Sequence, residues 1–208
     1  MSQQLFKNDV LFFQRILKVS GFYKGPLDGK WTSAVDKAED EFEAAYVALR
    51  DQMGAFDTRT ERNIETLIPT AQKLARSFMN TVKGLPNECR IISGTRTYAE
   101  QDQLFAIGRT IRKNERTVTK ARGGQSNHNF SIAWDIGLFT STGKYMTGDT
   151  KSEEKAYADV AKLVKTKVAG LEWGGDWDSF KDPPHYQVAT NKSLKDVRTL
   201  FEAGKSFT

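Results

Sequence analysis

The stretch SNHNFSIAWDIGL at residues 126–138 holds His128 and, seven residues later, Asp135. The second of the two histidines in the chain, His185, stands in DPPHYQV at residues 182–188. A neutral imidazole is the commonest metal ligand in proteins, and two histidines with one carboxylate and an open water position form a frequent catalytic zinc arrangement. The residues therefore predict one metal site made of His128, Asp135 and His185.

Short apolar runs around these histidines predict β-strands. One covers residues 133–138 and contains Asp135, one ends in the Tyr-Gln-Val that follows His185, and another is Arg-Ile-Ile-Ser at residues 90–93. Residues 152–167 place apolar side chains on one face at helical spacing. The sequence therefore predicts both strands and helices in this region.

The first 55 residues predict a small helical module. Apolar side chains recur at helical spacing between residues 9 and 19. The turn-rich segment GFYKGPLDG follows at residues 21–29, and a second helical pattern covers about residues 32–53. We place the domain boundary near residue 55, with a helical module at 1–55 and a second domain at 56–208 that share a continuous helix.

A helical pattern also opens the second domain. Asp57 and Thr58, with Glu61 in the following turn, predict a helix start. An apolar run at helical spacing follows from Ile64 to Phe78, so we expect helix through this segment.

Composition limits the class of protein. Of the 208 residues 38% are hydrophobic, so the chain can bury a core without a disulfide or a structural metal. The single cysteine, Cys89, excludes an intramolecular disulfide and a cysteine-rich zinc module, and its position favours a small buried residue. The apolar run at residues 10–13 is too short for a signal peptide or a membrane span, so we expect synthesis in the cytoplasm.

A formal net charge of +5 favours an anionic partner: nucleic acid, anionic lipid or an anionic cell-wall polymer. The densest basic stretch, residues 109–122, is either a solvated loop or a rim that attracts an anionic substrate. A nucleic-acid binder would rest on charge alone, because the sequence has no nucleic-acid recognition motif. We therefore expect no nucleic-acid partner, no stable membrane association and a monomer.

The N-terminal module resembles peptidoglycan-binding domains of the small three-helix type. The matching positions are Gln14, Leu17, Gly21, Phe22, Gly25, Asp28, Gly29, Thr32, Ala34, Val35 and Phe42. The match departs from the family after Asp28-Gly29, where the usual Phe-Gly step is replaced by Lys30-Trp31. The resemblance implies wall contacts by Phe22, Tyr23, Asp28 and Trp31. A helical cap that only packs on the rest of the chain is the alternative.

Four spaced motifs resemble the LAS-type zinc peptidases, the superfamily of phage L-alanyl-D-glutamate endopeptidases and bacterial D-alanyl-D-alanine carboxypeptidases. They are Ser93-Gly94-Thr95-Arg96-Thr97 with Gln101, Ser126-Asn127-His128 with Asp135, Trp173-Gly174-Gly175, and Asp182 with His185. The resemblance runs from about Asp57 to Val188, in the order of the family's motifs. It implies an α+β fold with a central, mainly antiparallel sheet flanked by helices.

The resemblance also implies chemical roles. His128, Asp135 and His185 would bind one Zn²⁺ and leave a fourth position for water. Asp182 would be the general base that takes the proton of this water and returns it to the leaving amine, with Glu172 as the rival base.

Further groups would act on the substrate. Arg96 would stabilise the oxyanion that forms as water attacks, and Gln101 and Ser126 would position the substrate. The structural alternatives are an ion-pair role for Arg96 and a turn role for Asp182, since Asp before Pro favours turns.

These inferences predict a modular phage endolysin that hydrolyses the L-alanyl-D-glutamate bond of the peptidoglycan stem peptide during host cell lysis. It would be made in the host cytoplasm without a signal peptide and would reach the wall through a membrane pore. A D-alanyl-D-alanine carboxypeptidase shares the metal site and is the first alternative. A non-catalytic zinc-containing wall-binding protein is the second, but it would need neither a base at Asp182 nor an oxyanion donor at Arg96.

Overall fold

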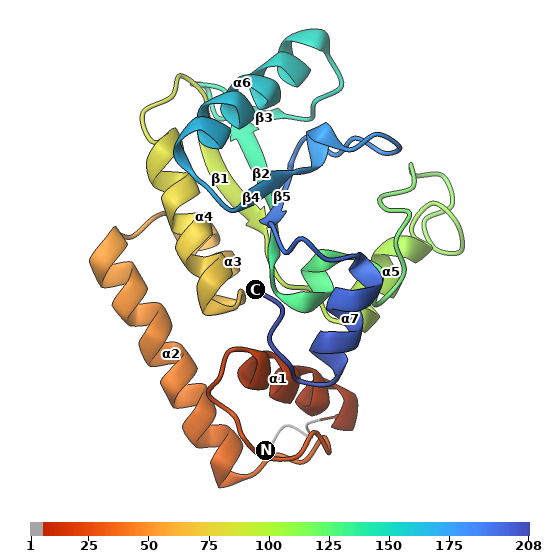
Figure 1. Cartoon of the computed structure of the whole chain (residues 1–208). Coiled ribbons are helices and arrows are strands. Elements are labelled where there is room, and N and C mark those ends of the chain that lie inside the picture. Colours follow the sequence, from red (N-terminus) through yellow and green to blue (C-terminus); the bar gives the residue numbers. More distant parts are fainter. Residues whose placement is uncertain (1–5) are drawn as a thin grey trace. The chain divides into compact units, whose positions relative to one another are not determined.

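The computed structural model describes residues 6–208, and contacts divide the chain into two compact units (Figure 1). One unit comprises the chain up to Ala45 together with Thr95–Ser131 and Thr190–Phe207. The other comprises Tyr46–Gly94 and Ile132–Ala189, with Thr208. Each unit is therefore assembled from segments that are distant in sequence.

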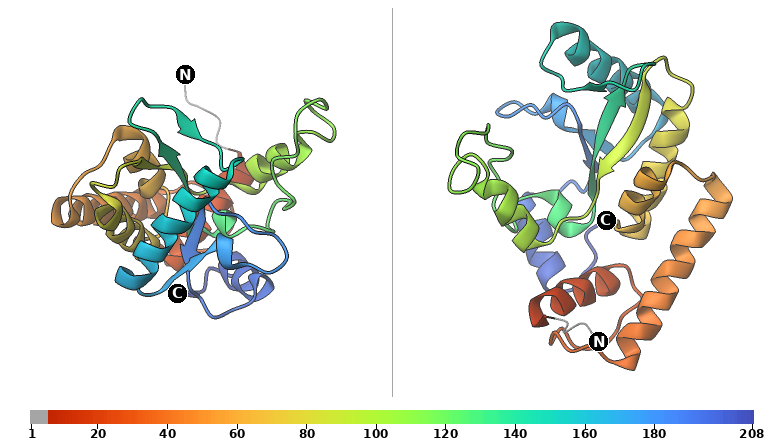
Figure 2. Two further views of the ribbon diagram at one scale, coloured as in Figure 1. Left: turned by 90° about the horizontal axis from the view of Figure 1, so that it is seen from above. Right: turned by 180° about the vertical axis from the view of Figure 1, so that it is seen from behind.

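The second unit is built on a five-stranded sheet. Its strands are β1 (Glu88–Ser93), β2 (Ala133–Phe139), β3 (Tyr145–Met146), β4 (Leu171–Trp173) and β5 (His185–Val188). The order is β1-β2-β5-β4, with β3 paired to β2, and every pairing is antiparallel. Figure 2 shows β1 and β2 side by side. The predicted α+β class and antiparallel sheet are confirmed, and β2 lies in the middle of the sheet.

Helices of the same unit cover one face of this sheet. They are α3 (Thr58–Glu65), α4 (Pro69–Val82) and α6 (Lys151–Lys167). Helix α4 packs against β1, β5 and α6, and α3 packs against β1. The rings of Trp134 and Tyr186 are fully buried and contact Phe78 of α4. Because side chains alternate along a strand, Asp135 and His185 then belong to the opposite face.

The apolar run from Ile64 to Phe78 is divided between two helices, which corrects the expectation of helix throughout. Proline has no backbone N–H and disfavours helical conformation in the residue before it. Ile68 accordingly adopts an extended conformation and caps α4, whose first residue is Pro69. The predicted start of α3 is confirmed, since the Asp57 carboxylate accepts hydrogen bonds from the backbone N–H groups of Arg59 and Thr60.

A buried ion pair joins α3 to α4. The Arg76 side chain is fully buried, and its guanidinium donates to both carboxylate oxygens of Glu61, at 2.7 and 3.1 Å. Glu61 also accepts from the Tyr46 hydroxyl at 2.7 Å and from the Phe56 backbone N–H at 2.8 Å. Arg76 donates in addition to the Gly54 carbonyl. This network ties the end of the long helix α2 to the core of the unit.

The first unit contains α1 (Lys7–Val19), the part of α2 (Ser33–Met53) up to Ala45, α5 (Tyr98–Ala106) and α7 (Leu194–Glu202). The Phe12 ring of α1 contacts Tyr98 and Phe201 edge to face. Helix α1 thus shares a core with segments much later in the chain. Helix α7 was not expected from the sequence. The helical pattern expected as far as Met53 is confirmed, whereas the boundary near residue 55 stays a prediction.

Gln14 holds the glycine-rich loop that follows α1. Its side chain is fully buried. The amide oxygen accepts from the backbone N–H groups of Asp28 and Gly29, and the amide nitrogen donates to the Lys30 carbonyl at 2.9 Å. Gly29 has a φ of 69° and passes close to Lys7, where a Cβ would lie 2.6 Å from the backbone oxygen. The turn signal at residues 21–29 therefore encodes one tightly held loop.

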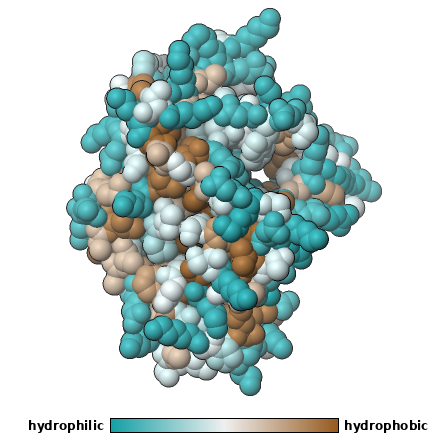
Figure 3. All heavy atoms as spheres, in the orientation of Figure 1, coloured by the Kyte–Doolittle hydropathy of each residue, from teal (hydrophilic) through white to brown (hydrophobic). Residues whose placement is uncertain are grey.

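The surface of the chain is mixed in character. Figure 3 shows hydrophilic residues between separate small apolar patches on the face it presents. Residues 112–118 of the basic stretch are exposed, while the guanidinium groups of Arg109 and Arg122 lie over the Phe105 ring, 4.0 and 4.4 Å from its centre. Within residues 6–208, no helix combines the length and the apolar character needed to cross a bilayer. Cys89 is buried, as expected.

Candidate metal centre

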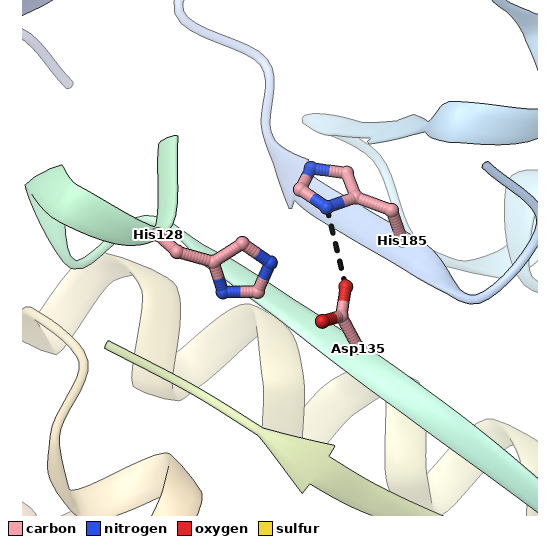
Figure 4. Close-up of side chains that lie close together, drawn as sticks. All are labelled: His128, Asp135 and His185. Carbon is pink, nitrogen blue, oxygen red and sulfur yellow. Dashed lines mark ion pairs between the residues drawn. The ribbon is translucent and has the colours of Figure 1, made fainter. Parts of the chain in front are cut away.

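His128, Asp135 and His185 come together. Each can offer one ligand atom, and these three atoms lie within 4.8 Å of one another. Figure 4 shows the two imidazole rings and the carboxylate pointing toward a common point. The side chains are withdrawn from solvent, with His128 1% and His185 4% exposed. Two imidazole rings and a carboxylate that converge in this way form a donor set that can hold a metal ion at its centre.

Strand register explains how Asp135 meets His185. The two residues face each other across the antiparallel pair β2 and β5. Opposite residues in such a pair have Cβ atoms about 5 Å apart, and the Asp135 Oδ1 lies 3.3 Å from the His185 Nδ1 (Figure 4). The pairing of β2 with β5 in this register therefore brings together two residues that lie fifty positions apart in the sequence.

A short turn presents His128. It lies in the 3₁₀ helix η1 (Asn127–Phe130), and the Ser126 hydroxyl accepts a hydrogen bond from its backbone N–H. Asn129 holds the turn in place, because its side chain accepts from Gly124 N–H and donates to the Arg96 carbonyl, both at 2.9 Å. Ser131 then adopts a left-handed conformation, with φ of 59°, and directs the chain into β2. These local contacts fix the turn that carries His128 just before β2.

The electrostatics of the cluster suit a cation. Burial opposes a charge on the His185 imidazole, yet the hydrogen bond and charge of Asp135, with contributions from Gln187 and Asp182, raise the pKa of His185 above its ordinary value. The surroundings thus stabilise positive charge at this position. Two imidazole nitrogens and one carboxylate oxygen are donors that zinc accepts in catalytic sites. The residues present fit the metal that the motifs imply.

Asp182 lies on the turn that leads into β5. Its backbone N–H donates to the Gly174 carbonyl, and its own carbonyl accepts from the His185 N–H, both at 3.0 Å. A Cβ on Gly174 would stand 2.6 Å from the Asp182 carbonyl oxygen and 3.0 Å from the His185 Cβ. Only glycine permits this close approach. The Trp-Gly-Gly motif therefore holds Asp182 beside His185, whose imidazole is also packed against the Trp177 ring.

The three predicted substrate-side residues lie near η1 and α5. The Arg96 backbone N–H donates to the His128 carbonyl at 3.1 Å, and its guanidinium donates to the Gln101 side chain at 3.5 Å. Gln101 is fully buried and donates to the Ala121 carbonyl at 3.0 Å. Gln101 thus anchors the end of the basic stretch and the Arg96 side chain. Ser126 is partly exposed and caps η1.

The residues predicted for wall binding lie on and beside the loop after α1. Tyr23 is buried and donates to the Pro26 carbonyl, and Phe22 contacts the Phe42 ring. Asp28 accepts from the Lys30 N–H and from Gln14, which lowers its pKa. Trp31 is partly exposed, stacks on Phe13 and hydrogen-bonds to Asp36. Of the four, Tyr23 is the least accessible, because it is 4% exposed.

Two contacts near His185 were not predicted from the sequence. Gln187 contacts the His185 ring through its amide oxygen, and its amide nitrogen donates to the Glu172 carboxylate at 2.6 Å. Glu172 is thus engaged with Gln187, which favours Asp182 over Glu172 as the base. Gln187 lies two residues after His185 on a strand, so the alternation of side chains could have identified it.

Two sequence comparisons show what the chain resembles. Residues 119–188 match a family model described as D-alanyl-D-alanine carboxypeptidase. The chain is 41% identical over 105 residues to the peptidoglycan L-alanyl-D-glutamate endopeptidase CwlK of Bacillus subtilis (strain 168), covering 49% of this chain and 60% of that protein. The chain therefore spans about three fifths of the length of this relative.

Among solved structures, the chain is similar to the Serratia marcescens L-Ala D-Glu endopeptidase ChiX. The TM-score is 0.46 at 22% sequence identity, over 69% of this chain and 92% of that chain. The sequence comparisons confirm the predicted resemblance to a superfamily that holds both carboxypeptidases and endopeptidases of peptidoglycan.

Proposed function

We propose that this chain, which resembles the LAS-type zinc peptidases, is a zinc-dependent peptidoglycan hydrolase that cleaves the L-alanyl-D-glutamate bond of the stem peptide. The convergence of His128, Asp135 and His185 within 4.8 Å carries the proposal, because this donor set suits catalytic zinc. The name of the Bacillus relative supports the choice of bond. The net charge of +5 supports an anionic wall polymer as the target, and an endolysin role remains part of the proposal.

The chemistry assigns one task to each group. Zinc, when bound, lowers the pKa of a water molecule toward neutrality and polarises the scissile carbonyl. His128, Asp135 and His185 would hold the ion. Asp182 accepts the proton of the attacking water and then donates it to the leaving amine. Arg96, whose backbone is bonded to His128, stabilises the negative charge that develops on the carbonyl oxygen.

The product of digestion tests the proposed bond. Peptidoglycan treated with the zinc-loaded protein is expected to yield peptides with a new N-terminal D-glutamate, measured by mass spectrometry. The matched family description favours a second candidate function, a D-alanyl-D-alanine carboxypeptidase. Release of free D-alanine in place of new N-termini would establish that candidate, and the absence of both products would reject hydrolase activity.

We also propose that residues 1–55 contribute to wall binding, with Phe22, Tyr23, Asp28 and Trp31 as the contact group. Trp31 is the sharpest test because it is partly exposed. The full-length Trp31→Ala variant is expected to sediment with purified peptidoglycan about tenfold more weakly, since aromatic residues are common binding hot spots. Tyr145→Ala, which removes an exposed aromatic ring from β3, is the control. Equal binding by the two variants would leave the module with a packing role.

A further inference from the structure

Four polar side chains line one face of the sheet across β2, β5 and β4. Asp135 faces His185 across β2 and β5, and Glu172 faces Gln187 across β4 and β5. His185 and Gln187 are two residues apart on β5, so their side chains point to the same face. Gln187 and Glu172, which are not proposed metal ligands, thus lie next to Asp135 and His185 on the same face of the sheet.

Close polar contacts connect the four residues in one row. The Glu172 Oε2 lies 2.6 Å from the Gln187 Nε2, and the Gln187 Oε1 lies 3.0 Å from the His185 Nε2. On the other side of the ring, the His185 Nδ1 lies 3.3 Å from the Asp135 Oδ1. His185 and Gln187 are 4% and 8% exposed. The contact between them is therefore largely protected from water.

The Glu172 carboxylate at the end of the row determines which atoms donate and which accept in the hydrogen bonds. An ionised carboxylate only accepts hydrogen bonds, so Glu172 requires the NH₂ group of Gln187 to face it. The Gln187 carbonyl oxygen must then face His185, and a carbonyl oxygen also only accepts. The His185 Nε2 must therefore carry a proton. In the neutral imidazole, this leaves the lone pair on Nδ1, which points toward Asp135.

We propose that Glu172 and Gln187 are positioning residues that fix the tautomer of His185, so that Nδ1 is the nitrogen offered to the metal. The proposal rests on the proposed zinc function. Partners that accept a hydrogen bond from the second nitrogen of a metal-ligating histidine fix its orientation and increase its basicity. Glu172 thus acts on the metal site through two hydrogen bonds, without being a ligand.

Wild-type protein provides the first test. The chain has only two histidines, so long-range ¹H–¹⁵N spectra of the full-length, zinc-loaded protein resolve all four ring nitrogens. We expect the His185 proton on Nε2 and a metal-bound shift at Nδ1. A proton on Nδ1 of His185 would overturn the proposal and leave the hydrolase function intact. A protein that binds no zinc would overturn both.

Two variants provide the second test. Gln187→Met removes the acceptor, and Glu172→Gln removes the charge that orients it. Zinc affinity, measured by competition with a chromophoric chelator, is expected to fall about 10- to 100-fold in Gln187→Met. Glu172→Gln is expected to lower affinity and to populate both His185 tautomers. Glu154→Gln makes the same charge change at an exposed site on α6 and should leave affinity unchanged.

A loss of zinc affinity in these variants could come from the loss of positioning or from unfolding, and the two causes can be distinguished. Circular dichroism and thermal unfolding report whether each variant keeps its structure. A folded Gln187→Met variant with wild-type zinc affinity would overturn the proposal. Should both variants unfold, the tautomer of His185 in the wild-type protein decides.

Discussion

Asp182→Asn is expected to abolish peptidoglycan cleavage while the protein keeps its zinc. Asparagine preserves the shape of the side chain and the backbone bonds to Gly174 and His185, but an amide cannot accept the proton of the attacking water. General acid–base catalysis contributes about 100- to 10,000-fold to rate, so kcat should fall by about that factor. Turnover is measured on purified peptidoglycan, and zinc content by elemental analysis.

The matched control is His128→Ala, which removes a proposed ligand instead of the proposed base. It should lose both zinc and activity, as should wild-type protein treated with a chelator. Adding zinc back should restore the chelated wild type and not the variant. Loss of zinc from Asp182→Asn would recast Asp182 as a ligand or a structural residue, and activity that survives chelation would remove the metal from the mechanism.

Glu61→Gln is expected to lower the free energy of unfolding by about 3–5 kcal/mol at pH 7, the usual cost of breaking a buried ion pair. The variant leaves the Arg76 guanidinium fully buried without its negative partner. Urea unfolding followed by circular dichroism measures the effect. The double variant Glu61→Gln, Arg76→Met removes both charges and should recover much of the loss. Equal stability of wild type and Glu61→Gln would show that the pair is not strongly coupled.

The pH dependence of this effect has a definite sign. Burial alone would raise the pKa of Glu61, but hydrogen bonds from Arg76, Tyr46 and the Phe56 backbone, with the Arg76 charge, hold it below its ordinary value. A carboxyl with a depressed pKa in the folded state stabilises the fold above its unfolded pKa of about 4.3. This stability is lost as the pH falls through the folded pKa. The difference between wild type and Glu61→Gln should therefore shrink below about pH 4.3.

Local signals account for the parts of the fold that the sequence predicted well. The capping aspartate before α3 and the apolar runs of β1 and β2 act within a few residues, so they can be recognised without knowledge of distant contacts. At Pro69 the effect of one residue overrides the helical spacing of apolar residues from Ile64 to Phe78. Proline interrupts a helix even where the apolar spacing would allow it to continue. Helix α7 was not expected, although the Ser193 hydroxyl caps its first turn.

Chemical identity follows from the sequence alone, since an imidazole or a carboxylate is the same donor wherever it lies. His128, Asp135 and His185 were predicted on that basis, and Asp182 from the resemblance to the zinc peptidases. Which groups meet is a property of strand register, and a shift of one residue would turn every side chain to the other face. Only the tertiary structure sets Asp135 opposite His185 and Glu172 opposite Gln187. The reason is that each pair joins two strands that are separate in the sequence, and neither strand alone determines how it aligns with the other.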